Sequence, residues 1–112
     1  MGNSVGDSME DFTLVLSTEE KRVCLRETNK KIKRILYVYE QSLKDTAYNY
    51  KSYVYAVILY ISSFNSLFNY ELANIVVNLN SLLINDLNKT QIRKIVLECK
   101  HIVEEIENKM GW

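Results

Sequence analysis

One long segment of this chain is almost free of charge. Residues 52–85 include a single charged residue, Glu71, although 25% of the whole sequence is Asp, Glu, Lys or Arg. Hydrophobic residues recur in the segment every three or four positions, which is the spacing of one face of a helix. We therefore expect residues 47–85 to form a hairpin of two helices, with the charged remainder of the chain packed around it.

The composition outside this segment also favours helices. The chain has 112 residues, enough for one compact domain, and contains no proline. Its three glycines are all near the termini, whereas a β-rich domain of this length needs turn residues at intervals of roughly 8–12 positions. The sequence therefore predicts an all-α fold, an antiparallel four-helix bundle over residues 17–112. Residues 1–16 are expected to form an extended or disordered N-terminal arm.

Capping residues indicate where the helices begin. Ser17 with Glu20, and Asn88 with Gln91, match the capping box, in which each residue's side chain accepts the other's backbone amide hydrogen. The first helix is expected to run to about Leu43, with Leu43 on its inward face, and the fourth to about Lys109.

The central hairpin has weaker signals. Asp45 and Thr46 are expected to cap a second helix over about 47–68. Asn69 is expected to cap a third over about 70–84, which puts Glu71 in the first turn, where the helix dipole favours an acid.

Residues suited to catalysis are not arranged for it in the sequence. The single histidine, His101, is predicted to face away from the core, and Cys24 and Cys99 occupy apolar stripes. No glycine-rich phosphate loop and no paired carboxylates on facing helices are present. We therefore expect a protein that is not an enzyme and uses no cofactor or metal. Two cysteines without a disulfide pattern, and no N-terminal signal segment, favour the cytoplasm.

Two groups of residues are candidates for binding. The first lies on the second and third helices, where aromatic, aliphatic and amide side chains exceed what one small core needs. Tyrosine provides a large contact area at low entropic cost. The candidate protein interface consists of Tyr53, Tyr55, Leu59, Tyr60, Asn74, Asn78 and Ser81. For the asparagines, the codon bias of an AT-rich genome is an equally good explanation.

The second group is a basic stripe along the first helix. Bases interleaved with an aromatic residue suit a phosphate backbone, although a basic face also simply keeps a helix in solution. The candidate nucleic-acid contacts are Arg22, Arg26, Lys30, Lys33, Arg34 and Tyr37.

These features lead to one main hypothesis and one alternative. The main hypothesis is a small helical interaction protein (an adaptor, inhibitor or immunity-type factor) that binds a protein partner. It would self-associate through residues 47–85, a dimer being the first expectation. The alternative is a nucleic-acid-binding helical subunit of an RNA-guided, phage or plasmid complex. A membrane hairpin is disfavoured, because tyrosine, serine and asparagine interrupt the apolar segment.

Overall fold

The computed structural model describes residues 17–111, and all of its regular elements are helical. The elements are α2 (Thr18–Ser42), α3 (Tyr50–Ser62), the short 3-10 helix η1 (Asn65–Phe68), α4 (Ala73–Ile84) and α5 (Lys89–Lys109). The four α-helices pack against one another, so the predicted all-α fold class is confirmed for these residues. The predicted arm, residues 1–16, lies outside the described residues.

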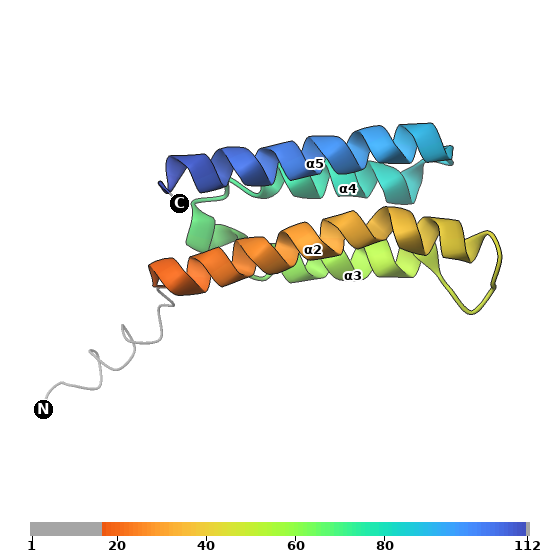
Figure 1. Ribbon diagram of the computed structural model, residues 1–112, viewed down its shortest axis with the longest axis horizontal. Coiled ribbons are helices and arrows are strands. Elements are labelled where there is room, and N and C mark those ends of the chain that lie inside the picture. Colours follow the sequence, from red (N-terminus) through yellow and green to blue (C-terminus); the bar gives the residue numbers. More distant parts are fainter. Residues whose placement is uncertain (1–16, 112) are drawn as a thin grey trace, which may run out of the picture.

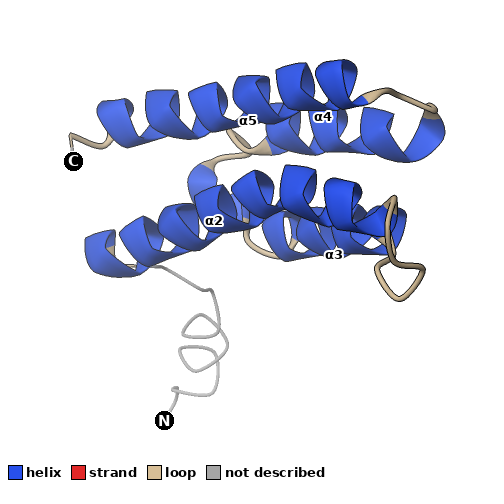
Figure 2. Cartoon of the chain, turned by 45° about the vertical axis from the view of Figure 1, so that its right-hand side comes forward, coloured by secondary structure: helices blue, strands red, loops and turns tan. Residues whose placement is uncertain are grey.

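Each α-helix packs on two neighbours. Helix α2 contacts α3 and α5, and α4 contacts the same two helices. In Figure 1 the connections 43–49 and 85–88 lie at one end of the molecule, and η1 lies at the other, where α2 begins and α5 ends. The helices form two layers, α2 with α3 and α4 with α5, which can be seen in the turned view of Figure 2. The centre between the layers is therefore enclosed by all four helices.

The hydrophobic core fills this centre. Every helix contributes residues spaced by three or four positions, as expected for an apolar stripe that faces inward. The most deeply buried large side chains are Leu25, Ile32, Ile35, Ile61, Phe68, Leu72, Ile75, Leu79, Leu82 and Ile92. One polar residue, Thr28, is fully buried among the described residues; its hydroxyl donates to the carbonyl oxygen of Cys24 at 2.8 Å, which satisfies it.

Both predicted capping boxes are confirmed. The Ser17 amide donates to Glu20 Oε1 at 2.9 Å, and the Glu20 amide donates to Ser17 Oγ at 3.1 Å. At α5, Asn88 and Gln91 make the corresponding pair of bonds, each at 2.9 Å. The bonds with Ser17 also hold the pKa of Glu20 below its ordinary value, because they favour the carboxylate form.

The predicted start of the second helix is wrong by three residues. Asp45 does accept a backbone hydrogen bond, from Ala47 at 2.9 Å, but this bond closes only a local turn. The cap is Asn49, whose Oδ1 accepts the Ser52 amide at 3.0 Å, so α3 begins at Tyr50.

The predicted inward position of Leu43 is also wrong. Helix α2 ends at Ser42, and Leu43 starts the connection at the end of the bundle, where its side chain is 68% exposed. Val38 is buried instead.

The second helix also ends earlier than predicted, at Ser62 rather than near Phe68. The Ser63 hydroxyl donates to the Tyr60 carbonyl oxygen at 2.6 Å, and such bonds compete with the helical ladder. The chain then forms η1, which turns Phe64 and Phe68 into the core with their ring centroids 5.8 Å apart.

The third helix begins at Ala73, and the predicted cap at Asn69 is wrong. Asn69 and Tyr70 both have left-handed backbone angles, with φ of 53° and 61°, which end η1 and redirect the chain. This conformation is tolerated by asparagine but costly for tyrosine. Asn65 holds the connection in place, because its Oδ1 accepts the Leu72 amide at 3.0 Å.

The position of Glu71 is corrected as well. It precedes α4 and so does not belong to the first turn of that helix. Its Oε1 lies 3.4 Å from Lys109 Nζ, so that its carboxylate links the start of α4 to the end of α5.

The hydroxyl of Tyr50 provides a test of the core. Its oxygen is buried without a partner among the described residues, beside Tyr39, whose ring meets the Tyr50 ring edge-on at 5.2 Å. Burial, with a smaller contribution from Tyr39, raises the pKa of Tyr50 to about 12 from 10.0. A raised pKa in the folded state contributes stability that is complete below pH 10 and is lost as the pH rises through 12.

We therefore predict that Tyr50→Phe raises the free energy of unfolding by about 1 kcal/mol at neutral pH, because an unpartnered buried hydroxyl is removed. We also expect it to lose less stability than the wild type between pH 10 and 12. Urea unfolding at several pH values measures both effects. The prediction is contradicted if the variant is less stable than the wild type and loses as much free energy of unfolding between pH 10 and 12. That result would show that the Tyr50 hydroxyl is hydrogen-bonded or reaches water.

Candidate functional site

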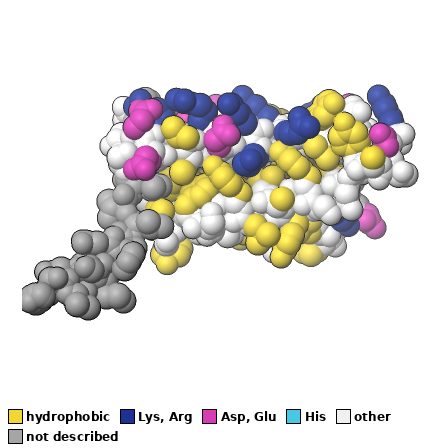
Figure 3. All heavy atoms as spheres, turned by 90° about the horizontal axis from the view of Figure 1, so that it is seen from below, with side chains coloured by type: hydrophobic (Ala, Val, Ile, Leu, Met, Phe, Trp, Pro, Cys, Tyr) yellow, Lys and Arg dark blue, Asp and Glu magenta, His cyan; other side chains and the backbone are white. Residues whose placement is uncertain are grey.

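The outer surface of α3 and α4 carries no charge over most of its length. We call this surface the α3–α4 face. It consists of the exposed residues Ser52, Tyr55, Ala56, Leu59, Ser62, Ser63, Ala73, Val77, Asn80 and Ile84. Charges flank it at its two ends, where Lys51 pairs with Asp86 and Glu71 pairs with Lys109, and along its α2 edge, where Lys31 lies over the Tyr60 ring. Figure 3, viewed from the side of α2 and α3, shows Lys and Arg side chains along one edge and mainly hydrophobic or uncharged side chains elsewhere.

Four large apolar side chains stand out on this face. Tyr55 and Leu59 on α3 are 54% and 52% exposed, and Val77 and Ile84 on α4 are 68% and 76% exposed. Sequence reasoning selected the first two and missed Val77 and Ile84. The missed signal was their spacing of seven residues, which puts two apolar side chains on one side of α4, away from its buried stripe.

The other two tyrosines of the predicted interface lie against α2. The Tyr53 hydroxyl donates to the Lys31 carbonyl oxygen at 3.2 Å. Lys31 Nζ also lies 4.8 Å from the centre of the Tyr60 ring, and both tyrosines are half-buried. These rings therefore cover the seam between α2 and α3 and are not part of the α3–α4 face.

The polar residues of α4 that were predicted to belong to the interface mostly form hydrogen bonds within their own helix. Asn78 Nδ2 donates to the Asn74 carbonyl oxygen at 2.8 Å, and Ser81 Oγ donates to the Asn78 carbonyl oxygen at 2.6 Å. Asn74 also lines a pocket with residues of α5. Asn74, Asn78 and Ser81 therefore lie on the side of α4 that faces α5. The asparagine of α4 that belongs to the α3–α4 face is Asn80.

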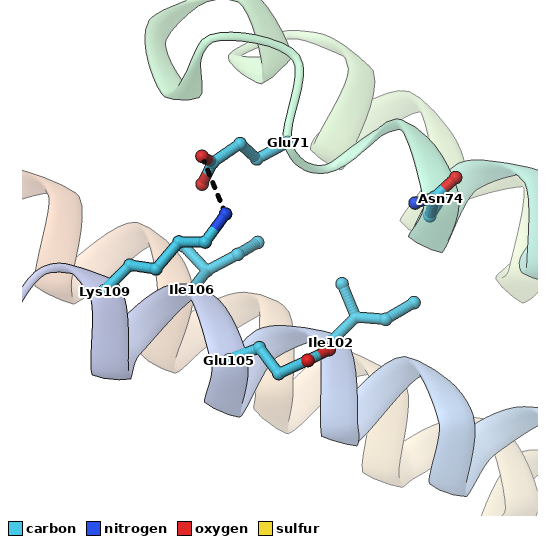
Figure 4. A pocket seen from close by; sticks show the side chains of 6 residues that line it. All are labelled: Glu71, Asn74, Ile102, Glu105, Ile106 and Lys109. Atoms are coloured by element: carbon cyan, nitrogen blue, oxygen red, sulfur yellow. Dashed lines mark hydrogen bonds and ion pairs between the residues drawn. The ribbon is translucent and has the colours of Figure 1, made fainter.

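That pocket is a hollow of about 230 Å³ between the start of α4 and the end of α5. Figure 4 shows the Glu71–Lys109 ion pair, Asn74 and Glu105, and the Ile102 and Ile106 side chains. It contains no nucleophile beside a base, which acyl or phosphoryl transfer through a covalent step requires. We find in it a surface ion pair above two isoleucines, and no arrangement that carries a reaction.

The residues of the basic stripe are all on the outside of α2. Arg26, Lys33 and Tyr37 are exposed, and the Arg34 guanidinium lies 5.1 Å from the centre of the Tyr37 ring. Two of the predicted bases have acidic neighbours on the same helix. Arg22 Nη1 lies 3.3 Å from Glu19 Oε2, and Lys30 Nζ lies 3.3 Å from Glu27 Oε2.

The two thiols are not activated. Burial raises the pKa of Cys99 to about 12, with a smaller contribution from Glu98, and its thiol lies 4.0 Å from the Ile75 carbonyl oxygen. Burial and the negative charge of Glu20 also raise the pKa of Cys24. A nucleophilic cysteine needs the opposite shift.

Two further observations concern other kinds of site. Within residues 17–111, no three His, Cys, Asp or Glu side chains gather closely enough to hold a metal ion. No helix in the same part of the chain is both long enough and apolar enough to cross a membrane.

The chain was also compared with known proteins. No protein-family model, curated protein sequence or solved structure matches it.

Proposed function

We propose that this chain is a non-enzymatic helical interaction protein of the cytoplasm, an adaptor, inhibitor or immunity-type factor, whose α3–α4 face binds a protein partner. We propose a second copy of the same chain as the first partner, with each copy folded as an antiparallel bundle. The placing of connections 43–49 and 85–88 at the same end of the molecule supports that arrangement.

The observation that carries the proposal is the exposure of four large apolar side chains on a face without charge. Tyr55, Leu59, Val77 and Ile84 are each more than half exposed. Solvated helix faces normally carry Lys and Glu, whereas the centres of protein interfaces are depleted in charge and enriched in tyrosine. Water contact with these side chains is unfavourable, and a partner that covers them removes it.

The lack of charge on the α3–α4 face favours self-association. In a symmetric dimer the same patch meets itself, so a charged face would place like charges opposite one another. The α3–α4 face avoids this repulsion. Small residues three or four positions from the large ones, such as Ala56 before Leu59 and Ala73 before Val77, leave room for the partner's side chains.

The size of the face predicts the strength of the contact. Helix α3 has 13 residues and is about 20 Å long, and two packed helices are about 20 Å wide. These dimensions give about 400 Å² per copy, or about 800 Å² in total, which is smaller than the interfaces of stable complexes and indicates a weak contact, with a dissociation constant in the micromolar range or above.

Sedimentation equilibrium tests the proposal. Between about 1 and 200 µM, a range that brackets micromolar affinity, the mass should rise from 13.1 kDa towards twice that value. A mass of 13.1 kDa at every concentration would remove the second copy as the partner.

A further inference from the structure

A cluster of positive charge extends across two helices on the α2–α5 side of the molecule. Helix α2 exposes four bases there, and α5 adds two that follow Lys89 in sequence. We call this group the cationic cluster: Arg26, Lys30, Lys33, Arg34, Arg93 and Lys100.

An ion pair between the helices places the α5 residues. Lys89 Nζ lies 3.3 Å from Glu40 Oε2, so that side of α5 is next to α2. Arg93 and Lys100 follow Lys89 by four and eleven residues, which is about 40° and about 20° around the helix axis. Both therefore lie on the side of α5 that adjoins the outer surface of α2.

The Glu40–Lys89 ion pair also shows where Arg93 and Lys100 lie along the bundle axis relative to the residues of α2. Figure 1 shows that α5 ends where α2 begins. Counted back from the Glu40–Lys89 contact, Arg93 lies level with about residue 36 of α2 and Lys100 with about residue 29. Lys33 thus lies between them along the axis, and the cluster extends over roughly 15 Å.

The cluster is poorly neutralised within residues 17–111. Lys30 has its pair with Glu27, and Arg34 lies over the Tyr37 ring. Arg26, Lys33, Arg93 and Lys100 form no ion pair with any described residue. Glu27, which pairs with Lys30, and Glu104, four residues after Lys100, offset part of this charge, and the cluster keeps a net positive charge. Like charges held close together repel, and an anionic ligand relieves that repulsion.

The charge and length of the cluster favour the phosphate backbone of a nucleic acid as its ligand. Phosphates repeat every 3.4 Å along one strand of a duplex, so a 15 Å surface meets about four of them. Tyr37 is the one aromatic residue of the stripe, and the Arg34 guanidinium lies over its ring at 5.1 Å, so the surface offers no series of aromatic rings on which successive bases could stack. A membrane surface is disfavoured, because an interfacial helix needs a continuous apolar face beside its bases, whereas the large apolar residues that α2 and α5 expose, Val23, Tyr37 and Leu97, are scattered singly.

We propose that the cationic cluster binds the backbone of a nucleic acid without reading its sequence. Single-stranded RNA and duplex DNA present the same phosphate chemistry to it. This activity is separate from the α3–α4 face and does not depend on dimer formation.

Fluorescence anisotropy tests the proposal, with a labelled single-stranded RNA and a labelled duplex DNA of about 20 nucleotides and base pairs. With about four phosphates neutralised, we expect micromolar binding at about 50 mM salt and a slope of log K against log salt of about −3 to −4. The two probes distinguish single strand from duplex. Arg26→Glu/Lys33→Glu should weaken binding at least about tenfold and reduce the slope by about 2.

The control is Lys44→Glu/Lys51→Glu, which changes the net charge equally at exposed positions outside the cluster. It also breaks the Lys51–Asp86 ion pair, so circular dichroism is used to verify its fold. We expect it to weaken binding by less than about threefold, because these two exposed charges lie outside the cluster, do not contact the bound backbone and are partly screened by salt. If the reversal variant unfolds, the neutralising pair Lys33→Gln/Arg93→Gln serves instead. Equal losses in cluster and control variants would overturn the proposal. So would no binding at low salt, or binding only to anionic phosphatidylserine vesicles.

Discussion

Leu59→Glu should abolish self-association while leaving the folded monomer intact. Leu59 is 52% exposed on the α3–α4 face, so a glutamate there reaches water in the monomer. In a dimer that covers the face, two unpaired carboxylates would be buried, because the face provides no base to pair with them. We expect the dimer dissociation constant to rise by about 100-fold or more, equivalent to about 3 kcal/mol.

Leu97→Glu is the matched control. Leu97 is 53% exposed on α5, so the two variants make the same chemical change at almost the same exposure on different faces. Sedimentation of both variants gives the comparison, with circular dichroism to verify the helices. A dimer that survives Leu59→Glu, or one that Leu97→Glu disrupts equally, would contradict the assignment of the α3–α4 face.

Phe68→Ala should cause the largest loss of stability that we predict. The Phe68 side chain is 1% exposed and is among the largest fully buried side chains of the described core. It lies in η1, where the chain passes from α3 towards α4, and its ring packs against that of Phe64. Truncation leaves a cavity as well as removing apolar contact, and we expect the free energy of unfolding to fall by about 3–5 kcal/mol.

Tyr70→Ala provides the control for that measurement. Tyr70 belongs to the same connection but is 67% exposed, and alanine keeps the Cβ that makes its left-handed backbone costly, so we expect this truncation to change stability by no more than about 0.5 kcal/mol. Urea unfolding of both variants gives the values. A loss below about 1 kcal/mol for Phe68→Ala would show that η1 does not anchor the connection, since a buried ring normally costs several times more.

The sequence predicted the helices that have strong local signals. The boxes at Ser17 and Asn88 satisfy backbone donors with residues three positions away, so they act without help from the rest of the fold. The inward stripes of α2 and α5 follow from the same local periodicity, because each helix has charged residues on its other side.

The connection between α3 and α4 could not be predicted in the same way. Its shape depends on the Asn65 side chain bonding to Leu72, seven residues away, and on Tyr70 adopting a backbone conformation that its own preferences oppose. The burial of Phe68 compensates for such local costs only once the helices have packed. Contacts of this kind leave no mark in the spacing of residues along the chain.

The candidate sites were predictable only in part, for a related reason. A residue's position in the sequence determines the side of its own helix on which it lies, and this identified Tyr55 and Leu59. The sequence position does not determine which neighbouring helix covers that side, and Tyr53 and Tyr60 lie against α2. Likewise, Arg93 and Lys100 join the bases of α2 only because α5 packs beside that helix.

The claim that the α3–α4 face is the contact surface is tested most directly by a dilution series of ¹H–¹⁵N correlation spectra. Between about 500 and 10 µM, a range chosen around micromolar affinity, we predict that amide shifts change along residues 52–63 and 73–84. Amides on the outer faces of α2 and α5 should stay constant. Shift changes confined to α2 and α5, or spectra that do not change with concentration, would contradict the proposal.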